Sequence, residues 1–218
     1  MGRAHLERLL AAYGPHVNVY LTNIERRPAL NDARATVVRY DVDQDALADY
    51  HRPRIQPLID AGIDLLVFET IPCLSEARAL ASLLSEDGVA HIPTWVSFCL
   101  GSADRVASGD GLLACVDALF GVPQLAGIGV NCGRPMHTVT AIASLRPITE
   151  RTLVAYPNRG GVYQGDARQW ACAKNAVDTQ QWANALFDAG ADVVGGCCQT
   201  TPDDVRLLRQ LRDQRFSR

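Results

Sequence analysis

The chain has 218 residues, of which 48% are hydrophobic and 21% are charged, proportions typical of one globular domain with an ample core. Its formal net charge of −3 gives no reason to expect nucleic acid or an anionic membrane as a partner. No long apolar run predicts a transmembrane helix, and the charged residues near the N-terminus argue against a signal peptide. We therefore expect a single cytoplasmic domain over residues 1–218.

The first 60 residues contain one well-marked helix. Asp43 has the side chain of an N-cap, and it predicts a helix that runs to about residue 60 with bends at Pro53 and Pro57. The residues before it are predicted to form a short amphipathic helix, a short strand and a long loop, at 2–13, 17–21 and 22–41.

From residue 64 onward, short apolar runs alternate with helical patterns. Strands are predicted at 64–68, 94–98, 125–130, 152–155 and 193–194. Helices are predicted at 76–85 with Ser75 as the cap, at 110–120, 135–145 and 179–188, and from about 201. The strand ends recur every ~25–40 residues, which is the size of one βα unit. The segments Asp60-Ala-Gly-Ile-Asp64 and Asp188-Ala-Gly-Ala-Asp192 each precede a strand and repeat one another.

This alternation predicts an α/β fold with a parallel sheet, either a barrel or a doubly wound sheet. No Gly-x-Gly-x-x-Gly follows any strand, which argues against a dinucleotide-binding sheet. Polar or reactive side chains recur at the strand ends: Glu69, Ser97, Cys132, Asn158, Cys197 and Cys198. Active sites of TIM barrels lie at that edge, so we expect a (β/α)8 TIM-barrel type of which about six of the eight units are recognisable.

Seven cysteines, an odd number at irregular spacing, indicate a reducing compartment and a metal or catalytic use for some thiols. Cys197 and Cys198 follow two glycines at the end of the last strand, and adjacent cysteines suit a disulfide poorly. Two thiolates on one turn suit zinc, but buried packing residues or a redox pair without metal are the alternatives. Cys132 is the natural third ligand, and three thiolates leave one position open, as in catalytic zinc sites.

The remaining candidates receive no metal role. The other four cysteines are interpreted as packing residues: Cys73, Cys99, Cys115 and Cys172. The five histidines lack metal-ligand spacing with each other.

Several motifs together resemble a known family. Gly129-Val130-Asn131-Cys132 and Gly195-Gly196-Cys197-Cys198 look like the zinc signature of the homocysteine S-methyltransferases, and Phe68-Glu69-Thr70-Ile71-Pro72 and Tyr156-Pro157-Asn158 match two further motifs. His51-Arg52-Pro53-Arg54 and the spacing from Tyr163 to Trp170 are most similar to the branch that uses S-methylmethionine or S-adenosylmethionine. The resemblance covers roughly residues 43–211, and residues 1–41 are a divergent or truncated N-terminal region.

The resemblance implies a zinc-dependent methyl transfer. Zn²⁺ held by Cys132, Cys197 and Cys198 would accept the homocysteine sulfur as its fourth ligand, and the thiolate would attack the methyl group of a sulfonium donor to give methionine. The implied substrate-binding residues are Glu69, Thr70, Asn131 and Asn158, with Glu69 holding the amino group of homocysteine.

Three of the candidate residues have ordinary structural alternatives. Asn158 either fills the open zinc position or forms a turn. Ser97 either bonds substrate or is a buried strand serine, and the aromatic side chains of Tyr163 and Trp170 either line the donor pocket or pack under their own loop.

Two of the family's features have no match here. Its chains begin with a strand that carries an Asp-Gly-Gly turn, followed by a second βα unit. We therefore hold two hypotheses. One is an active methyltransferase with small-molecule substrates, a barrel closed by residues 1–41 or by homo-oligomerisation, and a place in methionine biosynthesis. The other is a catalytically inactive paralogue that retains zinc binding.

Overall fold

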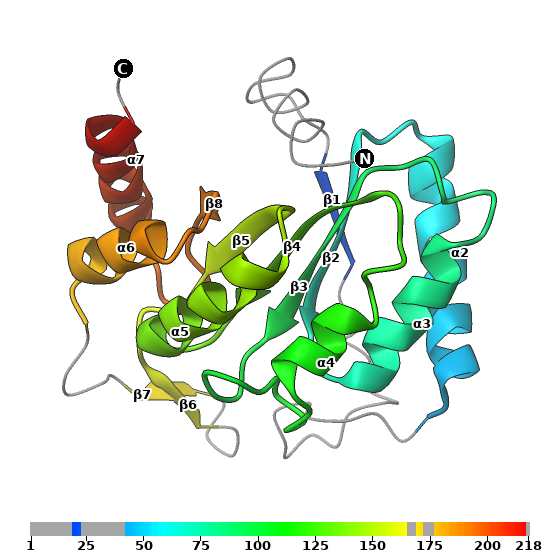
Figure 1. Ribbon diagram of the computed structural model, residues 1–218, viewed down its shortest axis with the longest axis horizontal. Coiled ribbons are helices and arrows are strands. Elements are labelled where there is room, and N and C mark those ends of the chain that lie inside the picture. Colours follow the sequence, from blue (N-terminus) through cyan, green and yellow to red (C-terminus); the bar gives the residue numbers. More distant parts are fainter. Residues whose placement is uncertain (1–18, 23–41, 165–168, 172–176, 217–218) are drawn as a thin grey trace.

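Strands and helices alternate along the chain (Figure 1). The computed structural model describes residues 19–22, 42–164, 169–171 and 177–216. The strands are β1 (Val19–Thr22), β2 (Leu65–Ile71), β3 (Thr94–Cys99), β4 (Leu125–Asn131), β5 (Thr152–Tyr156), β6 (Val162–Gln164), β7 (Gln169–Ala171) and β8 (Val193–Val194). The helices are α2 (Gln44–Asp60), α3 (Leu74–Leu84), α4 (Leu112–Asp117), α5 (Pro135–Leu145), α6 (Thr179–Asp188) and α7 (Pro202–Phe216).

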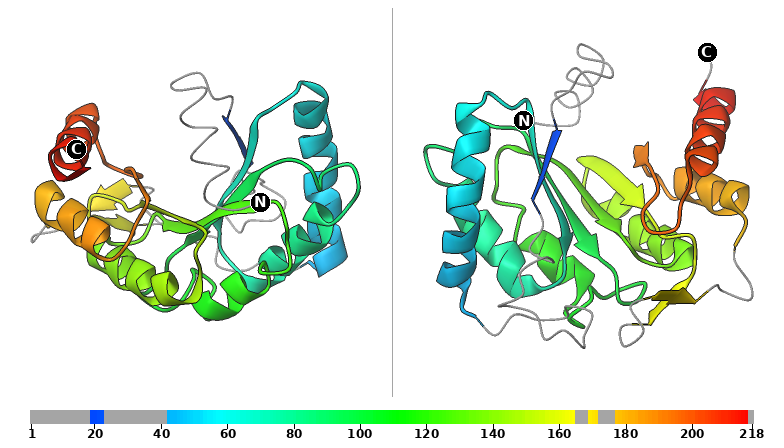
Figure 2. Two further views of the ribbon diagram at one scale, coloured as in Figure 1. Left: turned by 45° about the horizontal axis from the view of Figure 1, so that its top comes forward. Right: turned by 180° about the vertical axis from the view of Figure 1, so that it is seen from behind.

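Six strands form one parallel sheet in the order β1-β2-β3-β4-β5-β8. The helices follow one another in an arc around the outside of this curved sheet (Figure 2). A strand order that follows the chain, with every helix on one face, is that of a (β/α) barrel, because the strand order of a doubly wound sheet reverses. The predicted TIM-barrel type is confirmed. The six strands of the parallel sheet agree with the six units that the sequence predicted.

The two faces of the sheet differ because successive side chains of a strand point to opposite sides. Leu66 and Phe68 of β2 belong to the large core cluster between sheet and helices. Their neighbours Leu65 and Val67 belong to a small cluster that includes Ala126 of β4. The small cluster lies on the concave face, which corresponds to the interior of a barrel.

Helix α2 packs against α3 through a buried polar pair. The Asp43 side chain accepts a hydrogen bond from the amide of Ala46 at 2.8 Å, so the predicted N-cap is confirmed. Nε2 of His51 lies 3.0 Å from Oε1 of Glu76, and both side chains are 1% exposed. This buried pair therefore links α2 to α3 at the interface between the two helices.

The repeated Asp-Ala-Gly segments form the same turn twice. Gly62 follows α2 with φ +74° and Gly190 follows α6 with φ +94°, both in the left-handed region. Glycine adopts this conformation without a Cβ penalty, and it ends each helix just before a strand. The repeat in sequence is thus a repeat in structure.

Three predicted elements were wrong in their bounds. Helix α3 begins two residues earlier than predicted, because Cys73 is the N-cap in place of Ser75. The Asp110 carboxylate accepts a hydrogen bond from the amide of Leu74, the first of this helix, at 2.9 Å. A side chain distant in sequence therefore caps the helix in place of a local residue. Helix α4 covers only Leu112–Asp117, and β2 continues to Ile71.

The long loop after β5 contains an antiparallel hairpin, β6 and β7, that the sequence did not predict. The predicted helix at 2–13 and the loop at 23–41 lie outside the described residues. Within the described part of the chain β1 pairs only with β2, and β8 only with β5, so the sheet has two edges. No helix in the described ranges is long and apolar enough to cross a bilayer.

Candidate metal centre

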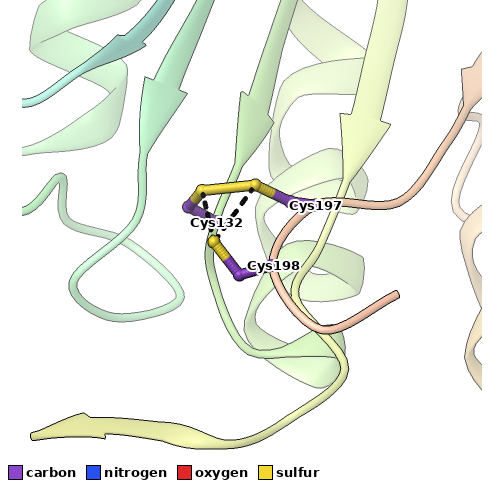
Figure 3. Close-up of side chains that lie close together, drawn as sticks. All are labelled: Cys132, Cys197 and Cys198. Carbon is purple, nitrogen blue, oxygen red and sulfur yellow. Dashed lines mark hydrogen bonds between the residues drawn. A yellow bond between two sulfur atoms is a disulfide. The ribbon is translucent and has the colours of Figure 1, made fainter. Parts of the chain in front are cut away.

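Three cysteine side chains meet at the carboxyl edge of the sheet. Cys132 follows β4, and Cys197 and Cys198 lie in the loop after β8. Their sulfur atoms all lie within 4.8 Å of one another, and all three residues are half-buried (Figure 3). The Sγ of Cys198 lies 3.9 Å from that of Cys132 and 3.8 Å from that of Cys197. The group is the one cluster of three or more potential metal ligands among the described residues.

Cys132 and Cys197 are joined as a disulfide in the structure, with their Cα atoms 5.7 Å apart (Figure 3). The bond links two strand ends across 65 residues of sequence. Cys198 is not part of this bond, and its sulfur lies beside both bonded sulfur atoms. The adjacent cysteines 197 and 198 are not bonded to each other, as the geometry of neighbouring cysteines leads one to expect.

The backbone around Cys132 is held in an uncommon conformation by β5 and the turn after it. Cys132 has φ +53°, a value that non-glycine residues rarely adopt. Its amide donates to the carbonyl of Tyr156 at 3.2 Å, and its carbonyl accepts from Nδ2 of Asn158 at 3.0 Å. Asn158 also donates from its own amide to the carbonyl of Gly133 at 3.0 Å. These three bonds fix the direction in which the thiol leaves the strand.

The loop with Cys197 and Cys198 lies against the same β5 turn. The amide of Cys197 donates to the carbonyl of Pro157 at 2.9 Å, and the carbonyl of Cys198 accepts from the amide of Arg159 at 3.0 Å. A Cβ on Gly196 would lie 2.7 Å from Cβ of Thr200, closer than such atoms approach, so the tight loop requires glycine there. In the Gly-Gly-Cys-Cys sequence, Gly196 is therefore required for steric reasons, whereas the cysteines supply the thiols.

Once reduced, the three thiols fit a zinc ion. Zinc with sulfur ligands at about 2.3 Å in tetrahedral geometry requires sulfur atoms about 3.8 Å apart. Two of the three sulfur pairs already have that spacing, at 3.8 and 3.9 Å. The third pair is the disulfide, which must be reduced because thiolates are the metal ligands. Three thiolates are soft donors of the kind that zinc prefers.

Asn131 connects the cysteines to the barrel interior. Its buried side chain donates from Nδ2 to Oγ1 of Thr70 at 2.7 Å and to Sγ of Cys132 at 3.7 Å. Thr70, which is also buried, has φ +65°, a strained value for a β-branched residue. The pairing of β2 with β3 is irregular between Phe68 and Ile71, so this strain coincides with a break in register.

A second set of polar side chains continues from Asn131 along the strand ends. Oγ of Ser97 lies 3.2 Å from Oδ1 of Asn131 and also forms a short hydrogen bond with the hydroxyl of Tyr156. The Tyr156 hydroxyl lies 3.3 Å from Oε2 of Glu69. Burial raises the pKa of Tyr156; the hydrogen bond with Ser97 opposes this shift, and Glu69 adds to it. The phenol therefore remains protonated at neutral pH and is a hydrogen-bond donor.

The structure brings most of the predicted site residues together. Glu69, Thr70 and Asn131 lie in one hydrogen-bonded group with Cys132. Asn158 turns toward the backbone: its Oδ1 accepts from the amide of Gly160 at 2.8 Å, and its Nδ2 bonds the Cys132 carbonyl. These contacts are those of the turn-forming alternative.

Sequence reasoning missed Tyr156, whose signal was its place at the end of a strand in the Tyr-Pro-Asn motif. Cys73 and Cys115 are buried away from the metal-ligand group, as packing residues are. The side chains of Tyr163 and Trp170, and all of Cys172, lie outside the described part of the structure.

Comparison with known proteins identifies relatives of the chain. The family model described as homocysteine S-methyltransferase matches residues 6–212. Homocysteine S-methyltransferase 1 of Brassica oleracea is 36% identical over 170 residues, which are 77% of this chain and 52% of the relative. Homocysteine S-methyltransferase 3 of Arabidopsis thaliana is 37% identical over 172 residues, 78% of this chain and 49% of the relative.

A solved structure agrees with these relatives. The metallated form of the homocysteine methyltransferase MmuM from Escherichia coli superposes with a TM-score of 0.65 at 33% identity, covering 79% of this chain and 54% of that one. The chain thus spans about half the length of the relatives that it matches.

Proposed function

Because the chain belongs to the homocysteine S-methyltransferase family, we propose that it transfers a methyl group from a sulfonium donor to the sulfur of homocysteine and forms methionine. The observation that carries the proposal is the meeting of three cysteine sulfur atoms from two strand ends. Asn131 contacts one of them, and hydrogen bonds through Ser97 and Tyr156 link Asn131 to Glu69. The proposed donors are S-methylmethionine and S-adenosylmethionine. The product places the activity in methionine biosynthesis.

In this proposal Cys132, Cys197 and Cys198 hold a zinc ion. When bound, the metal supplies a Lewis acid that keeps the thiol of homocysteine ionised at neutral pH. Asn131 donates to the sulfur of Cys132 and orients this ligand, as outer-shell partners of metal sites do. Glu69 binds the amino group of homocysteine with its carboxylate, and Thr70 fixes Asn131 from the other side.

The chemistry of the transfer requires little more than ionisation and alignment. The ionised homocysteine sulfur forms a bond to the methyl carbon while the bond from that carbon to the sulfonium sulfur breaks. The leaving group departs as a neutral thioether, so no general acid is needed. The site contributes by holding the two substrates in line at the carboxyl edge of the sheet.

A second candidate is a zinc-binding protein without turnover. The six strands of the described parallel sheet leave it with two edges, and strands that close a barrel would supply part of a substrate pocket. On the first proposal the pocket is completed by residues 1–41 or by a second copy of the chain. The irregularly spaced cysteines favour the reducing cytoplasm for either candidate.

Methyl transfer from a labelled donor distinguishes the two candidates. We would incubate the reduced, zinc-loaded protein with homocysteine and either S-[¹³C]methylmethionine or the corresponding S-adenosylmethionine, and follow labelled methionine by NMR. The proposal expects labelled methionine that accumulates over many turnovers with one of the two donors. Folded protein that holds zinc but transfers no label from either donor would contradict the enzymatic proposal and support the second candidate.

A further inference from the structure

Tyr156 is the unassigned member of the polar group at the mouth of the sheet. It ends β5, and its hydroxyl lies between two side chains from other strands, Ser97 of β3 and Glu69 of β2. Ser97 is fully buried, whereas Glu69 and Tyr156 are half-buried. Tyr156 therefore lies where the buried polar group meets the half-buried carboxylate.

Counting protons gives the direction of these hydrogen bonds. The Tyr156 hydroxyl donates to Oε2 of Glu69, which accepts as a carboxylate oxygen does. The Ser97 hydroxyl has one proton and two acceptors within reach, the phenol oxygen of Tyr156 and Oδ1 of Asn131, so it shares that proton between them. Ser97 also faces Oδ1 of Asn131, whose amide group is oriented by its donation to Thr70. The contacts thus run from the Cys132 ligand through Asn131, Ser97 and Tyr156 to the Glu69 carboxylate.

We propose that Tyr156 is a positioning residue for homocysteine: its hydroxyl, held by Ser97, orients the carboxylate of Glu69 toward the amino group of the substrate. This inference rests on the proposed function, since it assumes that Glu69 binds that amino group. It assigns to Tyr156 an effect on substrate binding that depends on the amino group of homocysteine.

The backbone of β2 supports this assignment independently of Tyr156. The register of β2 against β3 shifts between Phe68 and Ile71, the segment that contains Glu69. Thr70 there has φ +65°, and strained residues of this kind persist where the surroundings fix them. Irregularities in strands often redirect a side chain next to an active site. The Tyr156 hydroxyl, at 3.3 Å, is a hydrogen-bond donor that helps to hold the carboxylate at this position.

The test compares Tyr156→Phe with the unaltered protein in two ligands. The zinc-loaded, reduced proteins are titrated by calorimetry with homocysteine and with 4-mercaptobutanoate, which lacks the amino group. A lost hydrogen bond to a charged group predicts that the variant binds homocysteine roughly tenfold more weakly or worse. Its affinity for 4-mercaptobutanoate is expected to match that of the unaltered protein. Zinc content and the midpoint of thermal unfolding are measured on the same samples.

Tyr50→Phe is the matched control, because Tyr50 lies on α2 against His51 and Arg54 and the change should affect neither ligand. If Tyr156→Phe fails to fold, Ser97→Ala replaces it and should weaken homocysteine binding selectively, by a smaller factor. Equal loss of affinity for both ligands, or no loss for either, would overturn the positioning role while leaving the proposed function intact. Absence of homocysteine binding to the unaltered zinc-loaded protein would overturn both.

Discussion

The cysteines at the mouth of the sheet and those beneath its helices are the same residue in two environments. Cys132, Cys197 and Cys198 are half-buried at strand ends, and their sulfur atoms lie together. Cys73 and Cys115 are almost fully buried, at 1% and 0% exposure, and burial raises the pKa of both, that of Cys115 to about 12. The three cysteines at the mouth are accessible and close to one another, as metal ligands must be. Cys73 and Cys115 behave as small hydrophobic residues. Position in the βα unit, more than residue type, determines the chemistry.

The largest expected effect is the loss of a mouth cysteine. Cys198→Ser removes one of three thiolates, so we expect loss of bound zinc and a fall in methyl-transfer rate of more than about 100-fold, beyond the effect of changing an outer-shell partner. Cys198 is chosen because the disulfide does not include it. Elemental analysis and the labelled-methionine assay measure the two quantities. Zinc content equal to that of the unaltered protein would contradict the assignment of Cys198 as a ligand.

Metal removal should separate the two groups of cysteines in one experiment. In reduced protein treated with a chelator, we expect iodoacetamide to label Cys132, Cys197 and Cys198, because they are half-buried and no longer metal-bound. Cys73 and Cys115 should remain unlabelled until the protein is unfolded, since they are buried and their pKa values are raised. Peptide mass spectrometry reads the sites. Labelling of Cys115 as fast as Cys198 in folded protein would abolish the distinction.

Cys115→Ser makes the same change as Cys198→Ser, but at a buried cysteine away from the mouth of the sheet. The new hydroxyl would be buried without a prepared partner, which costs about 1–3 kcal/mol of the free energy of unfolding. For a chain of this size each kcal/mol lowers the melting temperature by roughly 2–4 °C. Zinc content should be unchanged. A variant that keeps its melting temperature but loses zinc would reverse the roles that we assign to the two regions.

The smallest effect concerns the helix that follows the mouth cysteines. Burial alone would raise the pKa of Asp204, but hydrogen bonds from Thr201 and Thr179 and the charge of Arg159 outweigh it and hold that pKa below its usual range. A folded-state pKa below the unfolded value stabilises the fold above the unfolded pKa, and this contribution is lost as pH falls through the folded value. Asp204→Asn should therefore lower stability at neutral pH and weaken its decline in acid.

Urea unfolding at neutral pH and at about pH 3 measures this difference. Asp203→Asn is the control, because that neighbouring side chain is 88% exposed and pairs with Arg206 on the surface. An acid dependence of Asp204→Asn as steep as that of the control would contradict the assignment.

Much of the fold was predictable because its signals are local. The sequence pattern predicted all six sheet strands to within a few residues, and Asp43 predicted its helix start, since caps and strand periodicity depend on neighbours in sequence. The start of α3 was not predictable, because its first amide is accepted by Asp110, 36 residues away. The hairpin of β6 and β7 was missed because its strands are only three residues long.

The site residues also differed in how far local sequence could predict them. The cysteines were found because a rare residue type recurs at strand ends, where a parallel sheet gathers its side chains. Tyr156 was missed because its role depends on lying opposite Ser97 and Glu69, which only the folded sheet reveals. Asn158 carries the right atoms for a ligand, yet its contacts are with backbone groups of the loop that holds Cys132.

The central claim is that the three mouth cysteines bind zinc through sulfur. X-ray absorption at the zinc edge of the reduced, purified protein tests it most directly. Our account predicts about one zinc per chain with three protein sulfur ligands at about 2.3 Å. Protein without zinc under reducing conditions, or zinc surrounded by oxygen and nitrogen alone, would contradict it.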